Sequence, residues 1–157
     1  MAGAAPKSSV LYLARFWPLL FLAGCAAHHR PAHLCDAGQI EFQSYCAACH
    51  QYDGQGMGDA PPLAGSPWVT GPENRVIRIV LHGVRGPMVL DGKTYDREMP
   101  GFGQILSDTQ TASLLSYVRR QFGAPSEPIT AETVSGIRAA NNTRTEYWHV
   151  DELLEKP

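Results

Sequence analysis

The stretch Cys46–His50, which reads Cys-Ala-Ala-Cys-His, constrains this chain more than any other. Thiols three positions apart at the end of a helix, here Cys46 and Cys49, can each add across one vinyl group of a haem, and the adjacent His50 can then ligate the iron. A zinc site would require a second pair of ligands, but no cysteine follows the stretch and the later histidines are widely separated. A thioredoxin-like pair would follow a strand in a βαβ pattern, which the sequence does not show. The stretch therefore predicts one covalently attached haem.

The N-terminal residues have the pattern of an export signal. Lys7 and Arg15 form a positively charged region, and Phe16–Ala23 forms a short apolar segment. Eight apolar residues are too few to span a bilayer, so a retained membrane anchor is the less favoured interpretation. We therefore expect residues 1–24 to be a signal peptide.

The end of this segment, Leu22–Cys25, resembles a bacterial lipobox. The resemblance implies cleavage before Cys25 and acylation of its thiol, so that residues 25–35 would form an acylated tether. The alternative is a plain secretory peptide with a chance cysteine. A lipid-anchored chain would lie in the bacterial cell envelope and face the periplasm, but Ala26 does not indicate whether the membrane is the inner or the outer one.

The net charge of the processed chain limits the kinds of partner that it can bind, and one cysteine remains to be assigned. Residues 1–24 contain two of the 13 basic residues and none of the 15 acidic ones, so the processed chain has a net charge of −4. A net negative charge argues against nucleic acid or an anionic lipid surface as a partner. Cys35, near the start of the first helix, is left over, and an odd cysteine in an exported protein is a free thiol or forms an intermolecular bridge; we favour a free thiol without a function.

Residues 36–123 have the pattern of a small helical domain, because capping residues and apolar periodicity recur along them. The expected helices cover residues 36–48, 73–81 and 108–122. Residues 53–59 are too rich in glycine for regular structure, and residues 86–96 are expected to form a loop with a turn at Asp91-Gly92.

A second ligand for the iron is expected among the methionines, because methionine sulfur is a soft ligand that raises the reduction potential. Met99 begins the sequence Met-Pro-Gly-Phe-Gly just before the last helix, and its proline and glycines favour a non-helical loop. Met88 and Met57 are rivals, since methionines more often fill gaps in cores than bind metals. His82, at the end of a helix, is a rival histidine ligand.

These features, in this order, resemble the small bacterial single-haem cytochrome c domains with His/Met ligation. The resemblance covers residues 36–123 and rests on the Cys-Ala-Ala-Cys-His stretch, the Pro61-Pro62 step, the Met99 loop and the capped last helix. It implies an all-α, cytochrome c-like fold of three to five short helices around one covalent haem c. It also implies His50 and Met99 as axial ligands, and a hydrogen bond from His50 to the carbonyl of Pro61 or Pro62.

Residues 124–157 form a C-terminal extension. After a proline-containing linker, a short helix is expected over Ala131–Ala140, with Thr130 as its N-cap. Residues 146–154 contain too many large apolar side chains for a disordered tail. Two arrangements are open, packing on the haem domain or docking on a partner, and we expect the former.

Together these features indicate an electron carrier rather than an enzyme, because an iron with two protein ligands leaves no site for a substrate. The expected donor is a dehydrogenase, such as a quinoprotein, or a quinol-oxidising complex. The expected acceptor is a soluble cytochrome or a terminal oxidase. The alternatives are a peroxidase-type enzyme and a haem ligand sensor, both of which would need an open sixth position on the iron.

Overall fold

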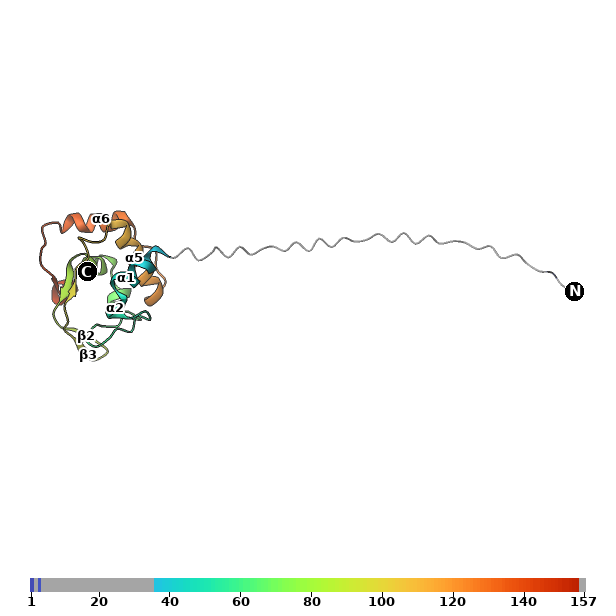
Figure 1. Ribbon diagram of the computed structural model, residues 1–157, viewed down its shortest axis with the longest axis horizontal. Coiled ribbons are helices and arrows are strands. Elements are labelled where there is room, and N and C mark those ends of the chain that lie inside the picture. The colour runs from blue at the N-terminus through green and yellow to red at the C-terminus, as the bar shows by residue number, and fades with distance from the viewer. Residues whose placement is uncertain (2, 4–35, 156–157) are drawn as a thin grey trace. The chain divides into compact units, whose positions relative to one another are not determined.

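The computed structural model describes residues 36–155, together with residues 1 and 3. Cys25, Cys35 and nearly all of the expected signal peptide and tether lie outside these residues. The described part forms seven helices and five strands of two or three residues each (Figure 1). It contains no helix that is long and apolar enough to cross a membrane.

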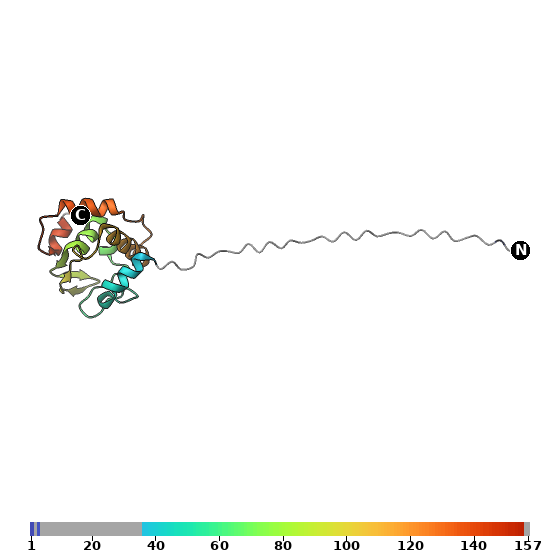
Figure 2. The same ribbon diagram turned by 45° about the horizontal axis from the view of Figure 1, so that its top comes forward.

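Helix α1 (Ala37–Tyr45) and helix α5 (Asp108–Phe122) lie side by side (Figures 1 and 2). As predicted, a side chain caps each helix: Asp36 accepts a hydrogen bond from a backbone N–H of α1, and Ser107 forms a capping box at the start of α5. A Cβ atom on Gly38 would lie 2.0 Å from the carbonyl oxygen of Ser113. The glycine therefore allows the backbones of α1 and α5 to touch where the helices cross.

The predicted helix over residues 36–48 is interrupted at Cys46. Helix α1 ends at Tyr45, and a separate turn, α2 (Ala47–His50), follows. The carbonyl of Cys46 accepts hydrogen bonds from the N–H groups of both Cys49 and His50, so a new helical turn begins there. The prediction of one continuous helix was wrong, because helix periodicity does not record a local change of hydrogen-bond pattern.

The main core lies among α1, α4 (Glu73–His82) and α5, with the short helix α3 (Pro67–Thr70) beside it. The side chains that this core buries most completely are apolar: Phe42, Ile77, Leu114, Leu115 and Val134. Helix α4 agrees with its predicted range to within one residue. The predicted all-α class is confirmed, since the helices form this core and the strands only join segments at its edge.

Three of the strands bring distant segments together. Strand β1 (Gly83–Arg85) pairs antiparallel with β4 (Met99–Pro100) and parallel with β5 (Trp148–His149). In this register Val84 lies opposite Met99 on one side and opposite Trp148 on the other. The C-terminal extension is thereby joined to the segment that carries Met99.

The segment expected to be a loop over residues 86–96 is instead a hairpin. Strand β2 (Met88–Leu90) pairs antiparallel with β3 (Lys93–Tyr95). The turn falls at Asp91-Gly92, as predicted, and both residues have positive φ (49° and 77°). This geometry matches the right-handed twist of short strands, so an Asp-Gly turn favours a hairpin. The apolar alternation beside it was too short to be recognised as strands.

The extension packs against residues 36–123, as expected. Helix α6 (Ala131–Ala140) agrees with its predicted range and contacts α4 and α5 (Figure 1). Val134 on α6 and Leu153 on α7 (Val150–Glu155) are fully buried, and Trp148 is nearly so. Trp148 and Leu153 of the expected apolar segment are therefore buried within this chain, whereas Leu154 is 57% exposed.

Candidate functional site

One pocket brings together the residues that the sequence singled out. Its lining includes Cys46, Cys49, His50, Pro61, Pro62 and Met99. Helices α4 and α5 supply much of the apolar wall, with Val76, Ile79, Val80, Leu114, Leu115 and Val118. Segments that are far apart in the sequence therefore meet around one space with a mainly apolar lining.

His50 is held in one orientation at this pocket. Its side chain is only 7% exposed, and Nδ1 donates a hydrogen bond to the carbonyl oxygen of Pro61 at 3.0 Å. Burial lowers the pKa of His50, and the hydrogen bond to Pro61 opposes this shift. A neutral imidazole with its proton on Nδ1 leaves Nε2 free to bind a metal. Of the two prolines left open by the sequence, Pro61 is the one whose carbonyl accepts the hydrogen bond.

The glycine-rich loop explains why the Pro61 carbonyl lies beside His50. The N–H of Gly56 donates to the carbonyl of His50 at 3.0 Å, and Gly56 has a φ of +74°. A Cβ atom on Gly56 would lie 2.3 Å from the carbonyl oxygen of Ala60. Only glycine fits this close approach, so the loop turns back and places Pro61 against the imidazole.

The two cysteines lie at the edge of the pocket as unpaired thiols. Cys46 is half-buried and Cys49 is exposed. Burial raises the pKa of Cys46 to about 12, and the charges of Cys49 and Glu41 add to the shift. The Cys46 thiol is therefore protonated at neutral pH. Within residues 36–155, no group of three or more His, Cys, Asp or Glu side chains is arranged to hold a metal ion.

The structure separates the rival ligands. Met57 is 58% exposed, and it does not line the pocket. His82 lines a different cavity. Met88, in β2, and Met99, in β4, both line the pocket, and Met99 also packs against the main core. Geometry therefore leaves two methionines within this space, and the Met-Pro loop favours Met99.

Sequence reasoning missed several residues of the lining. Trp68 from α3, Tyr95 from β3, and the exposed Arg97 and Glu98 all face the pocket. For Tyr95, the Asp-Gly turn was the one available signal. Such a turn favours a hairpin, and a hairpin would have placed a strand at the pocket where a loop was expected. Nothing comparable pointed to Trp68, whose place depends on how α3 packs.

The residues present fit a covalently attached haem. Paired thiols lie at the rim, a buried histidine has one nitrogen free for iron, a methionine lies in the same space, and the walls are apolar. Fold and site together define a small c-type haem domain. A family model for cytochrome c matches residues 35–121, more than half of the chain. The chain therefore belongs to the cytochrome c family, whose members carry covalent haem c.

Named relatives fall into two groups. Cytochrome c-552 of Thermus thermophilus is 32% identical over 120 residues, which cover 70% of this chain and 80% of the relative. The FixP subunit of the cbb3-type cytochrome c oxidase of Sinorhizobium medicae is 33% identical over 106 residues, covering 67% and 36%. The cytochrome subunit of the fructose dehydrogenase of Gluconobacter japonicus is 35% identical over 113 residues, covering 65% and 22%. The chain is thus similar to one small cytochrome and to parts of longer subunits.

Proposed function

We propose that this protein is a membrane-anchored carrier of single electrons and not itself an enzyme. Cys46 and Cys49 would hold the haem covalently, and His50 and Met99 would be the side chains that bind its iron. The observation that carries the proposal is the meeting of all four residues at one pocket. The haem supplies the one-electron chemistry.

The surrounding residues suit this role. Pro61 fixes the tautomer and the orientation of His50, and β1 fixes the backbone of Met99. The apolar walls from α4 and α5 keep water away, which favours the less charged ferrous state and raises the reduction potential. If His50 and Met99 both bind the iron, the iron would have no free position for a substrate.

The proposed partners are redox proteins. The donor would be a dehydrogenase, such as a quinoprotein, or a quinol-oxidising complex, and the acceptor a soluble cytochrome or a terminal oxidase. Two named relatives, one a subunit of a sugar dehydrogenase and one a subunit of a cbb3-type oxidase, support partners of these kinds. The net negative charge of the processed chain argues against nucleic acid.

The proposed location is the periplasmic side of the bacterial cell envelope, with acylated Cys25 as the anchor. Each buried methylene contributes about 0.8 kcal/mol, so two or three acyl chains would hold the protein stably at a membrane. Residues 25–35 would then tether the haem domain near membrane enzymes. A Cys25→Ser variant should move from the membrane to the soluble fraction, and mass spectrometry of the wild-type protein should show the acyl groups.

The experiment that tests the carrier function is optical spectroscopy of the purified holoprotein with carbon monoxide. We expect low-spin ferric haem with the weak charge-transfer absorption of methionine ligation, and no prompt binding of carbon monoxide to the reduced protein. A high-spin ferric spectrum with prompt binding of carbon monoxide or peroxide would contradict the proposal. It would indicate the open sixth position of a peroxidase-type enzyme or a ligand sensor.

A further inference from the structure

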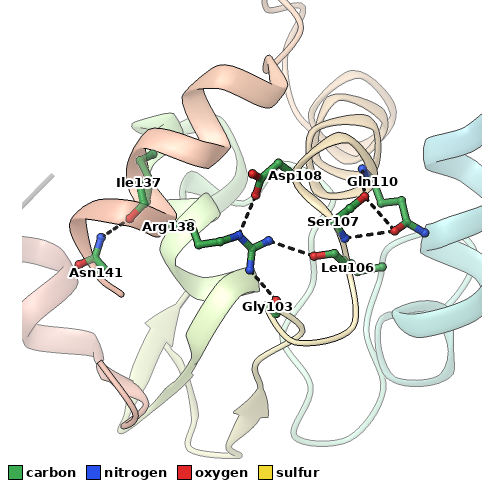
Figure 3. Close-up of polar contacts among 8 residues, drawn as sticks. All are labelled: Gly103, Leu106, Ser107, Asp108, Gln110, Ile137, Arg138 and Asn141. Carbon is green, nitrogen blue, oxygen red and sulfur yellow. Dashed lines mark hydrogen bonds and ion pairs between the residues drawn. The ribbon is translucent and has the colours of Figure 1, made fainter. Parts of the chain in front are cut away.

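One arginine of the C-terminal extension contacts the segment that follows Met99 (Figure 3). Nε of Arg138 donates to Oδ1 of Asp108 at 2.7 Å. Its Nη2 donates to the carbonyl oxygen of Leu106 at 2.9 Å, and its Nη1 donates to the carbonyl oxygen of Gly103. A single planar guanidinium therefore joins α6, the loop after Met99 and the first turn of α5.

The contacted loop is also held from its other side. The N–H groups of Phe102 and Gly103 donate to the carbonyls of Val80 and Leu81, at 2.8 Å and 3.0 Å. Gly103 is thus bound through both of its backbone polar groups, by the end of α4 and by Arg138. A Cβ atom on Gly103 would lie 2.6 Å from the carbonyl oxygen of Leu81, so the loop lies directly on the backbone of α4.

The helix that carries Arg138 is itself firmly placed. Val134 is fully buried, and Ile137 packs against the main core. Thr130 caps the start of α6, and the side-chain amide of Asn141 donates to the carbonyl of Ile137 at 2.7 Å near its end (Figure 3). These contacts hold α6 in place, so Arg138 lies in a fixed position beside the loop. Its hydrogen bonds can therefore hold the loop in place as well.

We infer that Arg138 is a positioning residue for Met99. It holds the Gly103 and Leu106 carbonyls, and so keeps the preceding methionine against the haem and slows the departure of its sulfur from the iron. Methionine sulfur is a weak ligand, so the freedom of its loop sets how often the bond opens. This inference rests on the proposed role of Met99 as the sixth ligand.

The test compares carbon monoxide binding to the reduced holoproteins of the wild type and of Arg138→Ala. Carbon monoxide can bind the iron only after the methionine has left it. We expect this binding to be about tenfold faster in Arg138→Ala than in the wild type, which corresponds to about 1.4 kcal/mol. The ferric charge-transfer absorption should also be lost at a lower pH than in the wild type. Unchanged binding and an unchanged pH of loss would overturn the inference.

Arg144→Ala is the matched control, because it removes the same charge from the same extension. The side chain of Arg144, which the substitution removes, donates to Glu146, Tyr147 and Glu152 and lies over the ring of Trp148, all within the extension. We expect ligand binding like that of the wild type. Equal acceleration in Arg144→Ala and Arg138→Ala would overturn the inference, since the effect would then come from lost charge or from loosening of the whole extension.

Two further variants test the geometry of the guanidinium and the identity of the ligand. Arg138→Lys keeps the charge but not the planar fork, so it should bind carbon monoxide at an intermediate rate, and a wild-type rate would overturn the inference even if Arg138→Ala fails to fold. Met99→Leu separates the two proposals. If it leaves the charge-transfer absorption intact, Met99 is not the ligand, and both proposals fail at that point. If it abolishes the absorption while the Arg138 variants behave as wild type, only the positioning role fails.

Discussion

The two sides of the haem pocket are built in different ways. On the side of His50, the thiols, the imidazole and the Pro61 carbonyl all come from residues 46–61, and a glycine-rich turn holds them together. On the side of Met99, the backbone is held by β1, the end of α4 and the distant Arg138. The proposed ligand His50 therefore depends on local structure, and the proposed ligand Met99 depends on long-range contacts. The Met99 side should be the easier one to open without unfolding the protein.

The largest effect is expected on the side of His50, which depends on local structure. His50→Ala should abolish nearly all stable holoprotein, because it removes the ligand that the surrounding turn is built to orient. Haem staining of denaturing gels and the absorption spectrum measure the result. His149→Ala, in the exposed part of β5, is the control and should keep its haem. Normal haem content in His50→Ala would show that the local side does not supply the essential ligand.

The next largest effect is expected on the side of Met99, where long-range contacts hold the backbone. Met99→Leu should leave the haem attached but lower the reduction potential by roughly 0.1–0.3 V, within the range of about 0.8 V that axial ligands cover. Potentiometric titration followed by absorbance measures the shift. Met88→Leu changes the other methionine of the pocket and should retain the ferric charge-transfer absorption. The reverse result, with the absorption lost only in Met88→Leu, would reassign the sixth ligand.

A smaller effect is expected at the crossing of α1 and α5, on the His50 side. Gly38→Ala should destabilise the holoprotein by about 1–3 kcal/mol, because the added Cβ would force α1 away from α5. Gly136→Ala, in α6, is the matched control, since a Cβ there meets open space. It should stabilise the protein by about 0.5–1 kcal/mol through better helix propensity. Urea unfolding compares the three proteins, and equal stability of the two variants would refute the close crossing.

The smallest effect concerns the extension that supports the Met99 side. A hydrogen bond from the backbone N–H of His149 is the main cause that lowers the pKa of Glu152, with a further contribution from Arg144. A lowered carboxyl pKa stabilises the fold above its ordinary value of 4.5, and this contribution disappears as the pH falls through the lowered folded value. Glu152→Gln should therefore cost less than about 1 kcal/mol at pH 7, because the Glu152 side chain is 39% exposed and solvent screens its interactions. The two proteins should have equal stability in acid, and a difference that grows as the pH falls would contradict this sign.

The accuracy of sequence reasoning differed among the elements. Helices α4, α5 and α6 were predicted nearly to the residue, because apolar periodicity and capping side chains are local signals. The break at Cys46 and the β2–β3 hairpin were missed, since each depends on a change of backbone hydrogen bonding over only a few residues. The strands β1, β4 and β5 could not be predicted, because each pairs with residues distant in the sequence.

The sequence by itself determined the chemistry of this protein. The spacing of Cys46, Cys49 and His50 specifies covalent haem, and membership of the cytochrome c family confirms that interpretation. The tertiary structure decided which proline carbonyl faces the imidazole. It also places Met57 and His82 outside the pocket and brings Arg138 to the Met99 loop. The physical reason is that covalent attachment needs residues adjacent in the chain. Holding a second ligand in place requires contacts that only folding creates.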